Sequence, residues 1–323
     1  MSGCSAVAGS DESGTSAAGD CDVAPDFPIG PIELVVPYAA GGGTDSVSRI
    51  LAEGMAERLG TQVNVLNQPG GGGAIGYQRV ASQAPDGQTL VMAVSDLGML
   101  HWLGLSDITP DDLSPVAQVN ADPAGITVAA DAEWDTLQDL LDDVESDPGG
   151  LVASGVGQGG IWHAALLGFL MSADLPADAI RWVPSDGAAP ALQEVVAGGV
   201  DVVTASLAEG RTLHDSGDVR ALAVMADERD PNFPDVPTVE EAVGIDYEMT
   251  VWRGLLGPEG MAEEVVQELD CTVAQVVESD DFIEFMDSSG LLINYRSTED
   301  FSTFLREDDE AKGTILEEAG LTS

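Results

Sequence analysis

Two glycine-rich segments, in different parts of the chain, have the chemistry best suited to binding a small anion. Residues 41–44 follow the apolar run 32–37, and residues 155–160 follow the apolar run 151–154. In loops without side chains the backbone N–H groups can approach a ligand closely, and the N-terminus of a following helix favours negative charge. For either loop taken alone, glycines that only permit a tight turn are the alternative interpretation. Two such loops on separate α/β units predict a cleft that closes on a small anion.

The second loop also fits a dinucleotide-binding fingerprint. Gly155, Gly157 and Gly160 have the spacing G-x-G-x-x-G, and Asp186 follows the next predicted strand, where an acid that binds ribose is expected. Against this interpretation, the preceding strand is short, the unit lies in the middle of the chain, and an exported protein rarely uses NAD. A binding protein is therefore the favoured function, and an NAD-dependent oxidoreductase is the alternative.

Other catalytic signatures are missing from the sequence. There is no G-x-S-x-G elbow and no P-loop, because the one lysine is Lys312, near the C-terminus. His101, His163 and His214 are too far apart for a metal motif, and three scattered cysteines make no zinc site. His163 follows the second glycine loop, where it could donate a hydrogen bond to a carboxylate or lie on a helix surface. We therefore expect no enzyme activity, no metal and no cofactor.

Alternating strands and helices must position these loops. The pattern β-loop-α-β-loop-α-β over residues 32–94 is typical of a doubly wound α/β fold, and the middle of the chain repeats it. Predicted strands are 32–37, 62–66, 89–94, 151–154, 180–183, 200–204, 220–225 and 291–296. Predicted helices are 75–82, 136–144, 189–197, 262–277 and 281–288, with others after residues 44, 161 and 298.

Charge limits the possible partners. The chain has 323 residues, enough for two domains, with 11 basic and 57 acidic side chains and a formal net charge of −46. Binding to nucleic acid or to anionic lipid needs clustered Lys and Arg, so we expect neither partner. Such acidity fits a salty habitat, where the Debye length is about 3 Å at 1 M salt, or an ordinary exported acidic protein.

The N-terminal segment indicates the compartment. Residues 1–27 are rich in Ser, Gly, Ala and Asp and are expected to form a flexible tether. Met-Ser-Gly-Cys at residues 1–4 resembles the end of a bacterial lipoprotein signal, so Cys4 is a candidate for lipid attachment and the chain for an extracytoplasmic location. Cys21 and Cys271 could form a disulfide or remain two unrelated thiols.

Longer runs of sequence carry a family resemblance. VVPYAAGGGTDSVSRILAEGMAERLG, SGVGQGGIWHAA, PDVPTVEEAVG and VWRGLLGPEGM resemble the substrate-binding proteins of tripartite tricarboxylate transporters, the Bordetella-uptake-gene type, in that family's order. The resemblance implies a two-lobed periplasmic-binding-protein (Venus flytrap) fold of the α/β class, with two hinge crossings, near 122–123 and 257–258. Lobe one would comprise 28–122 plus 252–323, and lobe two 123–251. The function implied is to deliver a small carboxylate to the transporter's membrane subunits, or to a sensor, and we expect a monomer.

The resemblance also implies a set of ligand-binding residues. Its two cleft loops map to Gly42, Gly43, Thr44 and Asp45, and to Gly157, Gln158, Gly159 and His163. Asp45 is unsuited to bind an anion directly, so we expect it to cap the first helix or orient loop waters. Where the family often has an aromatic residue and a lysine, this chain has Ser185 and Asp186, which could favour a ligand hydroxyl or amine. The candidate set is completed by Tyr38, Gly73, Ser95, Ser154 and Ser206.

Overall fold

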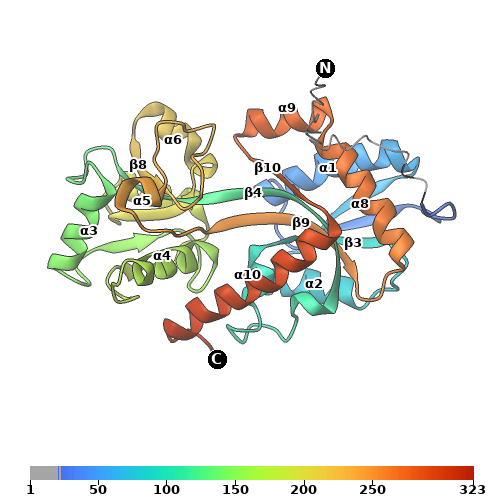
Figure 1. Cartoon of the computed structure of the whole chain (residues 1–323), viewed down its shortest axis with the longest axis horizontal. Helices are drawn as coiled ribbons and strands as arrows, with labels where there is room; N and C mark the ends of the chain where they lie inside the picture. The colour runs from blue at the N-terminus through green and yellow to red at the C-terminus, as the bar shows by residue number, and fades with distance from the viewer. Residues whose placement is uncertain (1–20, 22) are drawn as a thin grey trace, which may run out of the picture.

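A computed structural model describes Cys21 and residues 23–323, and the candidate lipid site Cys4 lies outside these residues. Strands and helices alternate through most of the described chain (Figure 1). The strands are β1 (Ile32–Val36), β2 (Val63–Asn67), β3 (Thr89–Val94), β4 (Leu113–Ala129), β5 (Val152–Ser154), β6 (Arg181–Trp182), β7 (Val202–Ser206), β8 (Val219–Val224), β9 (Thr250–Pro258) and β10 (Ile293–Arg296). The α-helices are α1 (Gly43–Leu59), α2 (Ala74–Ala81), α3 (Leu137–Ser146), α4 (Ile161–Ser172), α5 (Ala188–Val196), α6 (Arg211–Ser216), α7 (Val239–Val243), α8 (Glu263–Val277), α9 (Asp280–Ser289) and α10 (Thr298–Glu318).

Two long strands join the two halves of the molecule. The strand order is β2-β1-β3-β9-β4-β7-β5-β6, and β8 and β10 also pair with β4. The early part of β4 pairs antiparallel with β9, up to Pro123 opposite Thr250, whereas its later part pairs with β7 and β8. In Figure 1, β4 and β9 run between the two groups of helices. We call the elements β1–β3, β10, α1, α2 and α8–α10 the first half, and α3–α7 with β5–β8 the second half.

Each half has its own hydrophobic core. In the first half, the apolar stripe of α1 (Val47, Leu51, Met55) packs with Val273 of α8 against the sheet, as its helical spacing predicts. In the second half, α4 is buried over most of its length, so the helix after the second glycine loop is a core helix rather than a surface helix. The core of the second half also includes Met99, after β3, and Leu316 of α10, so the two cores adjoin at the junction of the halves.

Neither crossing strand was expected from the sequence, and the sheet is mixed rather than purely parallel. Within β4, Pro115, Gln118, Asn120, Asp122 and Pro123 interrupt any apolar run, so the segment shows no strand pattern. Residues 257 and 258, expected near a crossing, pair with Ser114 and Leu113 at the far end of the β4–β9 ladder. The other predicted elements agree with the structure to within a few residues.

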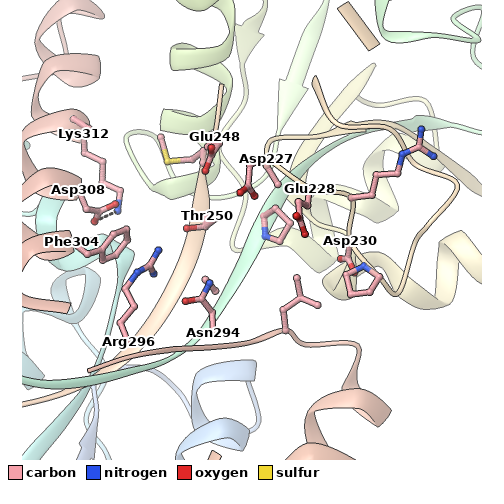
Figure 2. A pocket seen from close by; sticks show the side chains of 18 residues that line it. Asp227, Glu228, Asp230, Glu248, Thr250, Asn294, Arg296, Phe304, Asp308 and Lys312 are labelled. Carbon is pink, nitrogen blue, oxygen red and sulfur yellow. Dashed lines mark hydrogen bonds and ion pairs between the residues drawn. The ribbon is translucent and has the colours of Figure 1, made fainter. Parts of the chain in front are cut away.

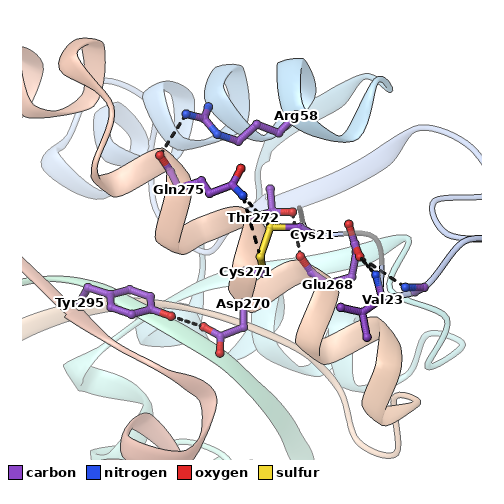
Figure 3. Close-up of a disulfide and its surroundings, with 10 residues drawn as sticks. Cys21, Val23, Arg58, Glu268, Asp270, Cys271, Thr272, Gln275 and Tyr295 are labelled. Carbon is purple, nitrogen blue, oxygen red and sulfur yellow. Dashed lines mark hydrogen bonds between the residues drawn. A yellow bond between two sulfur atoms is a disulfide. The ribbon is translucent and has the colours of Figure 1, made fainter. Parts of the chain in front are cut away.

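A disulfide joins Cys21 to Cys271 in α8 (Figure 3). The adjoining segment is also held by Glu268, whose Oε2 accepts a hydrogen bond of 2.7 Å from the Val23 N–H. The start of the described chain is therefore fixed to the first half. Among the described residues, no helix has the length and apolar character needed to cross a membrane.

Candidate functional site

A large cavity between the two halves brings together residues from five loops. Its volume is about 810 Å³, and its walls come from the loops after β1, β2 and β3 on one side and after β5 and β6 on the other. The candidates that line it are Tyr38, Gly157, Gln158, Ser185 and Asp186. Among the described residues, no basic side chain lines this cavity, so any anion bound there depends on backbone and hydroxyl donors.

A smaller pocket of about 290 Å³ lies at the N-terminus of α1. It is lined by Gly43 and Ser46 of α1, by Glu209 after β7, by Arg253 of β9, and by residues of α9. Gly42 is the N-cap of α1 and supplies no side chain, so no side chain caps the first N–H groups of this helix. The pocket combines a helix N-terminus with a guanidinium, and both attract anions.

Asp45 shapes the first loop and is not a wall of either pocket. Its Oδ2 accepts a hydrogen bond of 2.9 Å from the Gly41 N–H, and Arg49 and Asn67 bond to the same carboxylate. Burial alone would raise the pKa of Asp45, but the hydrogen bonds from Arg49, Gly41 and Asn67 hold it below its ordinary value. The acid that follows the glycines is therefore compensated and fixes their conformation.

His163 lies behind the second loop and does not line the cavity of about 810 Å³. Its Nδ1 accepts a hydrogen bond of 2.9 Å from the Gly159 N–H, and its ring stacks on Trp182 with centroids 4.5 Å apart. Burial lowers the pKa of His163 to about 4, so the imidazole is neutral near pH 7. A neutral ring that accepts at Nδ1 carries its proton on Nε2. His163 lines a second cavity, near the end of α10. His163 is therefore a buried residue and not one on the helix surface.

The N-terminus of α4 meets a carboxylate from the other half. Asp96, just after β3, lines the large cavity and interacts with the backbone N–H of Ile161, the first residue of α4. Burial raises the pKa of Asp96, whereas Lys312, the Ile161 N–H and the Tyr38 hydroxyl act in the opposite direction. The sequence analysis missed Asp96, and nothing in its local pattern distinguishes it from the many other acids.

The remaining candidates make internal hydrogen bonds. The Ser154 hydroxyl donates to the Val183 carbonyl at 2.8 Å, and the Ser206 hydroxyl lies 3.2 Å from Glu209 Oε2. The Ser95 hydroxyl accepts a bond of 2.8 Å from the Trp252 N–H. Gly73 packs beneath Tyr38, and a Cβ built on it would stand 3.2 Å from that hydroxyl. These residues support the loops and do not line either of the two pockets.

Arg253 is the cation that the sequence analysis missed. It is 6% exposed, and its Nη1 donates to Asp122 Oδ2 at 2.8 Å and to the Asn120 side chain. Its Nε lies 3.4 Å from the Thr44 hydroxyl, which links the crossing strand to the first glycine loop. An arginine inside the apolar run of β9 was the available signal, because charged side chains are seldom buried without a specific partner.

A third cavity, of about 400 Å³, lies where α10 and β10 meet the second half (Figure 2). Its acidic walls include Asp227 and Glu248, and its basic walls include Arg296 and Lys312. Burial, together with repulsion from Asp227, raises the pKa of Glu248. Lys312 is fully buried, with Nζ 3.1 Å from the Ser95 carbonyl and 2.5 Å from Asp308. No candidate residue lines this cavity.

Comparison with known proteins gives the family. Residues 47–321 match the model of the tripartite tricarboxylate transporter family receptor. A UPF0065 protein of Bordetella pertussis is 31% identical over 91% of both chains. A solute-binding protein of this family from Polaromonas is 33% identical with a TM-score of 0.79, over 90% of this chain and 99% of that one. MatC of Rhodopseudomonas palustris, solved with bound malate, is 28% identical with a TM-score of 0.75, over 90% of this chain and 100% of that one.

These matches confirm the expected periplasmic-binding-protein fold of the α/β class. They give no support to the oxidoreductase alternative, for which the glycine spacing before α4 was the main argument. Among the described residues, no group of His, Cys, Asp and Glu is arranged to hold a metal ion. The chain belongs to the receptor family of the tripartite tricarboxylate transporters, whose members are periplasmic solute-binding proteins and not enzymes.

Proposed function

We propose that this receptor captures a small carboxylate between its two halves and delivers it to the membrane subunits of a tripartite tricarboxylate transporter. The observation that carries the proposal is the uncapped N-terminus of α1, which opens onto the smaller pocket beside a guanidinium. Backbone donors and a cation together favour a carboxylate even in a chain of net charge −46, because close contacts outweigh distant, screened charges. The malate bound to MatC supports this ligand class.

Ligand capture would proceed by closure of two lobes, 28–122 plus 252–323 and 123–251. We place the hinges where β4 and β9 pass between the halves, around Pro123 and Thr250, which are paired opposite one another. A ligand that touches loops from both halves favours the closed arrangement. Loops from both halves line the cavity of about 810 Å³, which fits that requirement.

A carboxylate panel with scattering measurements tests this function. Succinate, malate, citrate and NAD are screened by thermal shift at constant salt, and a ligand at 100 times its Kd should stabilise the protein by about 2.7 kcal/mol. The radius of gyration should fall when that ligand is added, and the ligand should be recovered chemically unchanged. Absence of stabilisation by every carboxylate, or conversion of a bound one, would contradict the proposal.

We further propose that Cys4 carries the lipid that tethers the receptor to the membrane. The motif at residues 1–4 supports this proposal. Mass spectrometry of protein from a membrane fraction should find a lipid adduct on Cys4. A Cys4→Ser chain that stays in that fraction would contradict lipid anchoring.

We also propose that the receptor is adapted to a salty environment, which its acidity supports, and that it acts as a monomer. Repulsion among 46 excess negative charges is screened as salt increases, so Tm should rise from low to molar salt. Differential scanning calorimetry in a salt series, with light scattering for the molecular mass, measures both properties. A Tm that stays constant or falls would remove the argument for a salty habitat, and a concentration-dependent mass would contradict the monomer.

A further inference from the structure

Arg253 has one guanidinium edge that the protein does not use. Its Nη1 and Nε contact Asp122, Asn120 and Thr44, but within the described part of the chain Nη2 makes no hydrogen bond. Nη2 lies 3.1 Å from the position that a Cβ on Gly43 would occupy, and Arg253 lines the smaller pocket. The side chain is 8% exposed, and a buried guanidinium strongly favours an acceptor for each donor.

The N-terminus of α1 lies at the same place. The helical ladder begins with the Ser46 N–H bonding to the Gly42 carbonyl, so the N–H groups of residues 43–45 have no partner within the helix. Gly43 has no side chain between these groups and the guanidinium. Two independent features, a helix N-terminus and a buried arginine edge, therefore point to a carboxylate in this pocket.

Glu209 supplies a carboxyl group to the same pocket from the second half. Its Oε2 contacts the Ser206 hydroxyl and N–H, whereas Oε1 makes no hydrogen bond with the described residues. Burial raises the pKa of Glu209, whereas the charge of Arg253 and the hydrogen bonds from Ser206 act in the opposite direction. Glu209 and Arg253 form no ion pair with each other. Nearby opposite charges that do not meet leave space for a ligand that carries both signs.

We propose that Arg253 and the N-terminus of α1 bind the carboxylate of the ligand while Glu209 binds its ammonium group. This inference rests on the proposed function and makes it more specific: the receptor prefers 2-amino carboxylic acids to the matching unsubstituted or hydroxy acids. A pocket of about 290 Å³ suits so small a zwitterionic head group. The larger cavity, which has Asp96 and Asp186 and no basic wall, adds to the preference for a ligand of low net negative charge.

Two matched series of probes test the preference by isothermal titration. Succinate, malate and aspartate, and likewise propionate, lactate and alanine, differ only in the group on the second carbon. We expect the amino member of at least one series to bind at least tenfold more tightly than the other two. Glu209→Gln should abolish that difference, because it weakens binding of the amino member at least tenfold. Loss of a negative charge from the pocket should not weaken binding of succinate.

Further variants separate this inference from the proposed function. Arg253→Lys keeps a charge for Asp122 but loses the second edge, and should weaken every carboxylate at least tenfold in a folded protein. Glu248→Gln, in the cavity of about 400 Å³, is the matched acid control. It should leave the affinity for every probe, and the preference for the amino member, unchanged. If Arg253→Lys does not fold, Glu209→Gln alone decides the result.

The outcomes are distinct. Succinate or malate binding without an amino preference overturns this inference and leaves the proposed function standing. A preference for the amino member that survives Glu209→Gln also overturns this inference and leaves the proposed function standing. So does a preference that is lost in an Asp186→Asn variant but not in Glu209→Gln. Absence of binding by all six probes and by citrate overturns both.

Discussion

The two glycine loops look alike in sequence but meet different surroundings in the fold. Each follows a buried strand and opens a helix, α1 for the first loop and α4 for the second. The N-terminus of α1 is uncapped and lies beside Arg253, whereas the N-terminus of α4 already faces the Asp96 carboxylate. In the second loop, the Gly159 N–H is also occupied, by His163.

This difference concentrates the attraction for an anion on the first loop. There the acid of the motif, Asp45, is compensated by Arg49 and Asn67, so it leaves little field to repel a ligand. The second loop has no acid of its own but receives Asp96 from the other half. A glycine motif thus indicates where backbone N–H donors lie, and the neighbouring side chains in the fold determine whether these donors remain available to a ligand.

The largest expected effect is a pH dependence caused by His163 in the second loop. Burial holds its pKa at about 4, against about 6.5 in the unfolded chain, so only the unfolded chain binds this proton between those values. The free energy of unfolding should therefore fall as pH decreases from about 6.5, with a loss of about 3 kcal/mol complete below pH 4. Urea unfolding of the native chain and His163→Gln should diverge in this window. Parallel curves would show that His163 is not held neutral behind Gly159.

The next effect compares the same substitution in the two loops. Gly43→Val places a side chain against Arg253 Nη2 and should weaken succinate or aspartate binding more than tenfold, a loss of at least about 1.4 kcal/mol. Gly157→Val is the matching change in the second loop, where nothing lies within 4 Å of a Cβ, and its effect should be smaller than that of Gly43→Val. Circular dichroism verifies that both variants fold. Equal losses from the two variants would make the loops equivalent and remove the comparison.

The smallest effect concerns Asp96. Asp96→Ala removes the carboxylate at the N-terminus of α4 and should cost about 1 kcal/mol of stability, as loss of a helix cap usually does. The same change removes a negative charge from the large cavity, so the dianion succinate should bind a few-fold more tightly. Asp96→Asn keeps the shape and tests the charge alone. Weaker succinate binding by Asp96→Asn would mean that the carboxylate assists the ligand.

Much of the fold could be predicted because its parallel units show regular patterns. The runs 32–37 and 89–94 are continuous and apolar, and α1 has helical spacing on its buried face. β4 and β9 could not be predicted in this way. These strands contain the polar cluster of Asn120, Asp122 and Arg253 at the junction of the halves. The polar side chains interrupt the apolar pattern by which a strand is identified in a sequence.

Candidate site residues were predictable from the sequence only where they lie in the loop directly after a predicted strand. Tyr38, Gly157, Gln158, Ser185 and Asp186 lie in loops that follow predicted strands, and the fold brings them to one cavity. Arg253 and Glu209 lie on elements far apart in sequence, and their relation exists only after β4 and β9 join the halves. Asp96 and Glu209 are two of 57 acids, so composition gives no means to select them.

Lys312 is the one lysine side chain with which an amine-directed reagent can react in this chain, and it is buried. It is the only lysine, it is fully buried in α10, and its ammonium holds the Ser95 carbonyl close to the start of β9. Because this amine is buried and hydrogen-bonded, an acylating reagent should react with it faster when α10 separates from the segment after β3. The rate of acylation at Lys312, followed by mass spectrometry of its peptide, therefore reports how often the structure opens locally beside the strands that join the two halves.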